Sequence, residues 1–145
     1  MLGTFDYSAM LSVPAAVTFY MEAGGDDVAR RNRALALRAS RMLAEAWGTE
    51  LGTPEECVGS CCMVGLPAAL GSTMEEGKAL RMRLATTATA DYDGITTQFF
   101  FPAAGRLWLR LSAAVYNSLR EFEVLRDVIL DLAAAATATI AAKST

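Results

Sequence analysis

The chain has 145 residues, with 13 basic and 16 acidic side chains and a formal net charge of −3. Without an excess of positive charge, the composition argues against binding to nucleic acid or to an anionic membrane surface. A chain of this length buries roughly two thirds of its unfolded surface in one core, so we expect a single domain over residues 1–145. Although 53% of the residues are apolar, no apolar run reaches the roughly 18 residues that a membrane helix needs.

Residues 1–6 contain no basic stretch followed by an apolar core, so we expect no secretory signal and a cytoplasmic location. The chain has no histidine, and the spacing of Cys57, Cys61 and Cys62 fits no zinc pattern, so no metal site is expected. Cys61 and Cys62 lie in an apolar run, which favours buried packing over a redox or nucleophilic role.

Apolar residues recur at helical spacing over 7–23, with a kink or restart expected near Ser12 because Pro14 lacks an amide donor. The acidic pair after the two glycines, Asp26 and Asp27, is expected to cap a second, amphipathic helix that ends at Gly48. We interpret the arginines of this helix as a solvated face rather than a nucleic-acid site, because acidic residues flank them and the net charge is negative.

A short apolar stretch over 60–66 predicts a buried strand. Ser72 and Glu75 have the spacing of a capping box, in which each side chain bonds an unpaired backbone amide, and are expected to open a helix to about Ala90.

Residues 95–101, rich in threonine and phenylalanine, predict a second strand, and 102–105 a turn. The clearest strand is 106–112, because its residues alternate with a period of two. One face carries Leu107, Leu109 and Leu111, and the other carries Arg106, Trp108, Arg110 and Ser112.

Ser118 and Glu121 form a second capping box, which opens the closing helix. The alanine- and threonine-rich tail is expected to be disordered. In order, the elements are helix, helix, strand, helix, strand, strand, helix. This predicts an α+β fold with an antiparallel sheet of about three strands covered by helices on one face.

Three sequence blocks carry a resemblance to a known family. They are Gly-Thr-Phe-Asp-Tyr-Ser-Ala at 3–9, Leu-Ala-Glu-Ala-Trp-Gly-Thr-Glu-Leu-Gly-Thr-Pro at 43–54 continuing to Met-Val-Gly-Leu-Pro at 63–67, and Arg-Leu-Ser-Ala-Ala-Val-Tyr-Asn at 110–117. The chain resembles the C-terminal small domain of class V, cysteine desulfurase-like, pyridoxal-phosphate enzymes of fold type I. Within that branch it is most similar to plant L-cysteine desulfhydrases and isopenicillin-N-epimerase-like proteins.

The resemblance implies that Arg110 binds the substrate carboxylate, with Arg106 as a second candidate on the same face. A guanidinium presents two parallel donors that match a carboxylate, which lysine cannot do. The alternative is an arginine stacked on Trp108 and paired with a surface acid. The resemblance also implies that Gly3 and Thr4 contact the cofactor phosphate of an opposite subunit, whereas the alternative for Thr4 is a flexible terminal residue.

In family enzymes a lysine of a preceding large domain holds pyridoxal phosphate as a Schiff base, and this chain has only Lys78 and Lys143, neither in a setting that lowers a pKa. We therefore assign no catalytic residue here and expect the chain alone not to bind the cofactor. It is interpreted as a C-terminal fragment or truncated homologue of an enzyme that converts cysteine to hydrogen sulfide, pyruvate and ammonia. Alternatively, it is a non-enzymatic module that binds a protein partner or a second copy through Arg106, Trp108 and Arg110.

Overall fold

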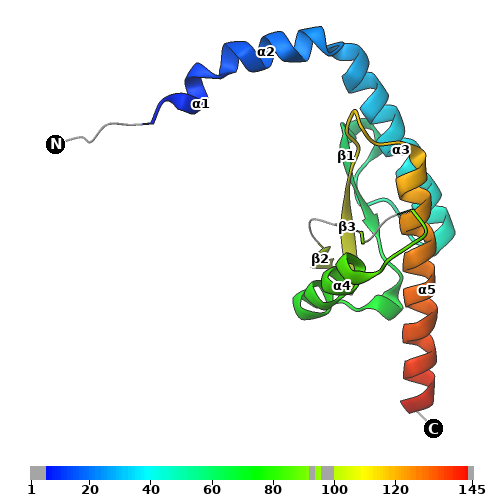
Figure 1. Ribbon diagram of the computed structural model, residues 1–145. Coiled ribbons are helices and arrows are strands. Elements are labelled where there is room, and N and C mark those ends of the chain that lie inside the picture. The colour runs from blue at the N-terminus through cyan, green and yellow to red at the C-terminus, as the bar shows by residue number, and fades with distance from the viewer. Residues whose placement is uncertain (1–5, 92–93, 96–99, 144–145) are drawn as a thin grey trace.

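The computed structural model describes residues 6–91, 94–95 and 100–143 (Figure 1). The elements follow the predicted order. They are α1 (Ser8–Leu11), α2 (Val13–Glu22), α3 (Asp26–Trp47), β1 (Cys61–Gly65), α4 (Met74–Thr86), β2 (Phe100–Ala103), β3 (Arg106–Ser112) and α5 (Leu119–Lys143), with 3-10 turns at Glu55–Cys57 and Ala68–Leu70. The prediction of an α+β fold with a three-stranded antiparallel sheet is confirmed.

Helices α1 and α2 form an arm that runs away from the rest of the molecule (Figure 1). The predicted restart at Ser12 is confirmed, since α2 begins at Val13 with Pro14 in its first turn, where a missing amide donor is tolerated. Neither helix buries a single residue. The arm therefore contributes nothing to the core.

Helix α3 ends as predicted at Gly48, whose φ of 62° is the left-handed conformation common after a helix C-terminus. Its start differs from the prediction. Gly25 occupies the N-cap position, and no side chain caps the helix. Asp26 and Asp27 lie in the first turn instead, where they favour the helix through its dipole rather than through a capping bond.

Strand β3 lies at the centre of the sheet, in the order β1-β3-β2, and both pairings are antiparallel. The predicted turn over 102–105 is wrong at its start, because Pro102 pairs with Leu107 as part of β2. The connection is shorter, with Ala104 and Gly105 both at positive φ, 50° and 75°, as in the tight turns that match the twist of a hairpin. Residues 96–99 of the predicted strand lie outside the described part of the chain.

Both edges of the sheet have a distinct local structure. On the β1 side, Leu51 forms an isolated antiparallel bridge with Val64, so the segment after α3 runs along that edge. On the β2 side, Pro102 lies within the edge strand itself. Proline is tolerated there because an edge strand leaves one side of its backbone unpaired.

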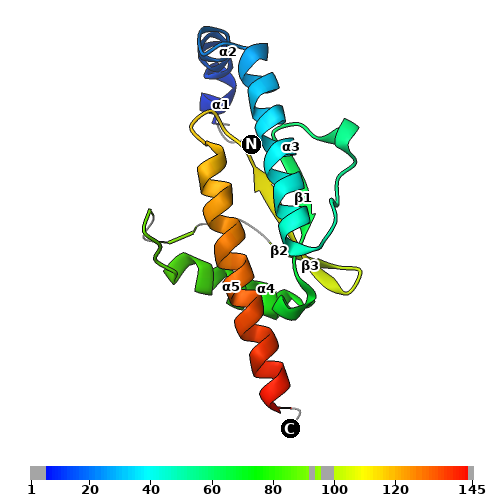
Figure 2. The same cartoon turned by 90° about the vertical axis from the view of Figure 1, so that its right-hand side faces the viewer.

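The core lies between the leucine face of β3 and the helices. The alternation of β3 is confirmed, since Leu107, Leu109 and Leu111 are all buried. Helices α3 and α5 lie side by side on this face (Figure 2) and contribute the fully buried Leu43 and Ile129. Helix α4 packs there as well. A Cβ on its Gly77 would lie 3.2 Å from Cβ of Phe100, so a larger residue would push the helix away.

The capping box of α4 is displaced by one residue from the predicted Ser72 and Glu75. The Thr73 hydroxyl accepts a bond from the Glu76 amide, and the Glu76 carboxylate accepts one from the Thr73 amide at 2.9 Å. The same carboxylate also accepts the Ser72 amide at 2.8 Å. Helix α4 ends at Thr86 rather than near residue 90.

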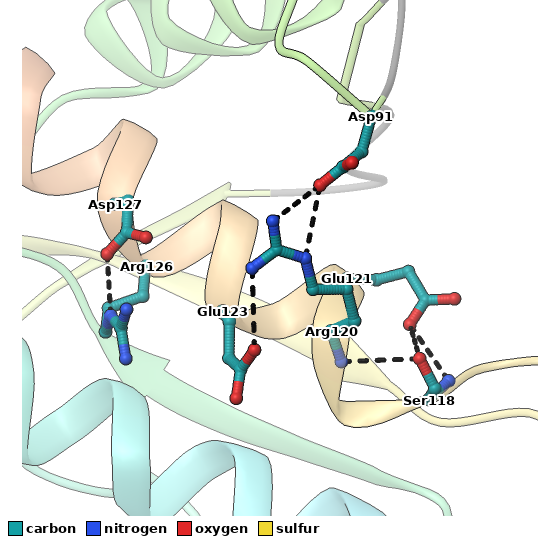
Figure 3. A network of polar contacts seen from close by, with 7 residues as sticks. All are labelled: Asp91, Ser118, Arg120, Glu121, Glu123, Arg126 and Asp127. Atoms are coloured by element: carbon teal, nitrogen blue, oxygen red, sulfur yellow. Dashed lines mark hydrogen bonds and ion pairs between the residues drawn. The ribbon is translucent and has the colours of Figure 1, made fainter.

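The carboxylate half of the second predicted capping box is confirmed at the start of α5 (Figure 3). The Glu121 carboxylate accepts bonds from the Ser118 amide and hydroxyl, while the Ser118 hydroxyl accepts the Arg120 amide. The predicted disorder of the tail is wrong, because α5 continues to Lys143. Alanine has the highest helix propensity, and an already nucleated helix extends at little cost.

Candidate functional site

The sheet face opposite the leucines carries the residues that the sequence assigned to binding. Helices α3, α4 and α5 cover the leucine face, so this other side, which we call the open face, is free of them (Figures 1 and 2). Arg106, Trp108 and Arg110 project from β3 onto it, as the alternation predicts, and all three are half-buried. The register adds Met63 of β1 beside Arg110 and Phe101 of β2 beside Trp108.

Trp108 is fixed in place on the open face. Its indole Nε1 donates to the Ala103 carbonyl oxygen at 3.0 Å. The segment beside β1 brings Gly52 directly over the ring, so close that a Cβ there would lie 2.8 Å from Cε3 of Trp108. An open hollow of about 320 Å³ lies between this segment and the β2–β3 hairpin. It is lined by Gly52, Met63, Phe101, Ala103, Ala104 and Trp108.

Arg106 makes the contacts that the alternative interpretation assigned to Arg110. Its guanidinium carbon lies 5.9 Å from the centroid of the Trp108 ring, and Nη1 lies 3.6 Å from Oε1 of Glu50. An exposed ion pair of this kind adds little stability, but it gives the Arg106 guanidinium a carboxylate from its own chain. An external carboxylate would therefore compete with Glu50 for the Arg106 guanidinium.

Arg110 lies one pleat further along β3, opposite Met63. Ser112 follows on the same face, and its hydroxyl lies 3.2 Å from the Cys61 sulfur. The site therefore combines a guanidinium with small polar groups, bordered by the apolar side chains of Met63 and Trp108. This is a setting in which a carboxylate can be bound through two parallel hydrogen bonds.

The cysteines divide between the two faces. Cys62 is buried as predicted, and burial raises the pKa of its thiol. The prediction is wrong for Cys61, which is exposed, because successive residues of a strand point to opposite faces. Cys57 is exposed as well.

Tyr116 and Asn117 lie in the turn that follows β3. The Asn117 side chain accepts the Ala114 amide at 2.9 Å, while Tyr116 is 82% exposed. Arg31 of α3 fixes this turn by donating to the carbonyl oxygens of Asn117 at 2.7 Å and Ala114 at 3.2 Å. No local sequence pattern identifies Arg31, because its partners are backbone atoms more than 80 residues away.

The interpretation of the α3 arginines as a solvated face is therefore only partly right. Arg33 donates to the carbonyl oxygens of Val58 at 2.8 Å and Glu55 at 2.9 Å, and Arg41 forms two hydrogen bonds with the Glu55 carboxylate. The Arg41 guanidinium lowers the pKa of that carboxyl. These arginines attach the loop before β1 to α3.

The described residues do not supply what pyridoxal phosphate needs for covalent attachment. Lys78 lies on the exposed side of α4 and pairs with Glu75 at 2.8 Å, whereas a Schiff-base lysine needs an enclosed site next to the cofactor. The Lys143 side chain lies outside the described part of the structure, as do Gly3 and Thr4. Over the described ranges, no group of three or more Cys, Asp or Glu side chains converges to hold a metal ion, and no helix has the length and apolar character to cross a bilayer.

Comparison with known proteins identifies relatives of one kind. The protein named "L-cysteine desulfhydrase" of Arabidopsis thaliana is 35% identical over 144 residues, covering 90% of this chain. The "Probable L-cysteine desulfhydrase, chloroplastic" of the same plant is 36% identical and covers 88% of this chain. Two proteins of Oryza sativa subsp. japonica whose names carry the same activity are 35% and 36% identical, each over 92% of this chain.

The match is nearly complete for this chain and partial for its relatives. The chain spans 28% to 32% of the length of these four proteins, which is consistent with a fragment of such an enzyme. No family model matches the chain.

Proposed function

We propose that this chain is the substrate-carboxylate-binding part of a pyridoxal-phosphate-dependent L-cysteine desulfhydrase and that it has no activity alone. The single observation that supports this most is the identity of about 35% to proteins of that name over nine tenths of the chain. The corresponding portion of those proteins is about 30% of their length. The remainder is where we place the cofactor lysine.

Arg110 is the residue we assign to the substrate carboxylate. It is half-buried on the open face, on the same side of β3 as the fixed indole of Trp108 and opposite Met63 of β1. A hydrogen bond between charged partners contributes about 1.5–3 kcal/mol to binding. The contribution is larger in a half-buried setting than in water. The residues Gly3 and Thr4 remain our candidates for the cofactor phosphate.

The cofactor, when bound in the complete enzyme, would acidify the α-carbon of cysteine so that sulfide can leave. In this chain Arg110 would bind the substrate carboxylate, and the ring of Trp108 would limit the movement of the bound substrate. The open face of the sheet would exclude part of the solvent from the substrate. The exposed Cys61 is not assigned a role in the reaction.

A chimera tests the assignment of Arg110. The matched segment of the Arabidopsis L-cysteine desulfhydrase is replaced by this chain, and sulfide release from L-cysteine is measured. We expect Arg110→Lys to lower kcat/KM by about 100-fold, mainly through KM, because one of two parallel bonds is lost. The matched control is Arg106→Lys, which should change kcat/KM by less than about threefold. Equal effects of the two variants would contradict the assignment.

The isolated chain tests the proposed lack of activity. Mixed with pyridoxal phosphate, it should give no imine absorbance, no borohydride-trapped adduct and no sulfide from L-cysteine. A trapped adduct that disappears in Lys78→Arg would contradict the proposal. We also propose a cytoplasmic location for this chain. One of the relatives is named as a chloroplast protein, so the compartment differs from that relative's.

A further inference from the structure

The hollow on the open face has walls that are held in place by hydrogen bonds. One wall is the Trp108 indole, which is fixed by its bond to the Ala103 carbonyl oxygen at 3.0 Å. Another wall is Met63, whose backbone is tied to the segment beside β1. The Gly52 amide donates to the Met63 carbonyl oxygen at 2.8 Å, and the Met63 amide donates to the Thr53 hydroxyl at 3.0 Å. Because these walls are already ordered, a ligand that enters the hollow loses little affinity to ordering them.

The hollow is apolar and has the size of a small-molecule site. None of its six lining residues carries a charged side chain, and its volume of about 320 Å³ lies in the range of roughly 300–1,000 Å³ that is usual for ligand pockets. A cavity of about 150 Å³ is already large enough to bind benzene. A charge is costly to place among apolar side chains without a partner, so the group that fits this hollow is uncharged.

The residues that border the hollow relate it to the carboxylate site. Met63 lines the hollow and is also the register partner of Arg110, to which the proposed function assigns the substrate carboxylate. Trp108 lines it as well, and Arg106 lies over the Trp108 ring while it pairs with Glu50. A second anionic group on the ligand would have to compete with Glu50. The hollow therefore favours a ligand with one carboxylate and one uncharged apolar group.

The spacing of the two sites matches a cysteine that carries a substituent on its sulfur. Arg110 and Trp108 project from the same face of β3, two residues and thus roughly 6.7 Å apart along the strand. Four bonds separate the carboxylate carbon of such an amino acid from the first atom beyond its sulfur, which is roughly 5 Å in the extended form. With the carboxylate at Arg110, the substituent can enter the hollow, whereas the thiol of cysteine itself ends short of it.

We propose that the hollow binds an uncharged apolar substituent on the substrate sulfur, so that the substrates include S-substituted L-cysteines. This inference rests on the proposed function. In the reaction the bond between Cβ and sulfur breaks, its electron pair leaves with the sulfur, and the sulfur gains a proton as the α-carbon loses one. Hydrolysis by one water then gives a thiol, pyruvate and ammonia, with no net oxidation or reduction. The hollow determines which substituent the released thiol carries.

NMR of the full 145-residue chain tests the hollow without the cofactor. Its two tryptophans give separate indole signals, because Trp108 donates to Ala103 at the hollow and Trp47 donates to the Arg126 carbonyl oxygen. We expect S-benzyl-L-cysteine to shift the Trp108 signal with a Kd of about 1 mM and to leave the Trp47 signal unchanged. S-Carboxymethyl-L-cysteine, with a charge in the same position, should bind at least about tenfold more weakly. Equal binding of the two compounds, or no Trp108 shift at about 10 mM, would overturn the proposal.

A substitution at the rim tests the hollow without altering the core. Ala103 is exposed and lies on the open face, in register with Arg106, so Ala103→Leu places a larger side chain in the hollow. We expect it to weaken the binding of S-benzyl-L-cysteine at least about tenfold. The matched control is Ala134→Leu, the same change at an exposed position of α5, which should leave binding unchanged. The same result in both variants would contradict the assignment of the hollow.

The chimera with the Arabidopsis L-cysteine desulfhydrase separates this inference from the proposed function. It should release benzyl thiol from S-benzyl-L-cysteine, and Ala103→Leu should lower kcat/KM for that substrate at least about tenfold more than for L-cysteine. Release of sulfide from L-cysteine without release of benzyl thiol would overturn the inference and leave the proposed function intact. No activity on either substrate would overturn the proposed function and the substrate class with it, while a retained Trp108 shift would still support the hollow as a site for apolar carboxylates.

Discussion

The arm and the sheet-bearing body of this chain are both rich in apolar residues, but only the body buries them. The body buries Leu43, Leu107 and Ile129 completely, whereas α1 and α2 bury nothing. Apolar periodicity in the sequence does not separate the two regions. It indicates that a helix face needs to be covered, but it does not indicate which segment covers that face. The difference indicates that the buried contacts that stabilise the fold lie in the body.

The largest expected effect comes from comparing the same leucine truncation in the two regions. Leu43→Ala in α3 should lower the free energy of unfolding by about 2–5 kcal/mol, because Leu43 is fully buried and its removal leaves a cavity. Leu11→Ala in α1, where the side chain is 78% exposed, should change it by less than about 0.5 kcal/mol. Urea unfolding of monomeric chain measures both, and equal effects would show that the arm belongs to the cooperative unit.

Close packing in the body should make a glycine position sensitive. Gly52→Ala places a Cβ 2.8 Å from the Trp108 ring, so we expect a loss of about 1–3 kcal/mol and a shift in tryptophan fluorescence. Gly59 provides the matched control, since nothing lies within 4 Å of its Cβ position. Gly59→Ala should be neutral or slightly stabilising. An unchanged fluorescence spectrum in Gly52→Ala would contradict the described position of the ring.

Helix starts should show the same contrast. Thr73→Ala removes the capping bond of α4 and should cost about 1 kcal/mol, measured by urea unfolding. Ser12→Ala, at the N-cap of α2, removes no capping bond and should have almost no effect. Ser72→Ala should also be nearly neutral, because the Ser72 contact to Glu76 comes from its backbone amide. A larger loss in Ser72→Ala than in Thr73→Ala would restore the capping box predicted from sequence.

The pH dependence of this cap follows from Glu76. Hydrogen bonds from the Ser72 amide and the Thr73 hydroxyl and amide lower the pKa of the Glu76 carboxyl below its ordinary 4.5. The unfolded chain thus takes up a proton at higher pH than the folded chain. Stability from the cap is present above pH 4.5 and is lost as the pH falls through the folded pKa, so Thr73→Ala should cost less at pH 3 than at pH 7.

The smallest expected effect concerns the hairpin turn. Ala104 has a φ of 50°, which costs an alanine more than a glycine. Ala104→Gly should therefore stabilise the body by up to about 1 kcal/mol, offset in part by the greater freedom of glycine when unfolded. Thermal unfolding measures the change, and a clear loss of stability would show that the turn conformation differs from the one described.

The sequence was sufficient where one local pattern had one solution. The alternation over 106–112 predicted both faces of β3, since a period of two fixes the side of every residue. The sequence was not sufficient where two adjacent pairs of residues fit the same motif. Ser72 with Glu75 and Thr73 with Glu76 both have the spacing of a capping box, and packing around α4 selects the second. Gly71 lies against Glu76 and leaves no room for a Cβ, which no pattern of spacing reveals.

For the candidate site, the sequence placed the arginines and the indole on one face but not their partners. The alternation does not predict that Arg106 lies over Trp108 and pairs with Glu50. Glu50 lies more than 50 residues earlier in the chain, so no local pattern connects the two residues. The role of Arg31 is likewise set by tertiary structure. Residue types and faces were predictable, whereas pairings between distant segments were not.

Both margins of the sheet discourage growth by strand addition. On one side the bridge between Leu51 and Val64 already occupies backbone groups, and on the other Pro102 offers no amide hydrogen to an incoming strand. Fibril-like stacking of such sheets is therefore disfavoured, even though the chain exposes much apolar surface.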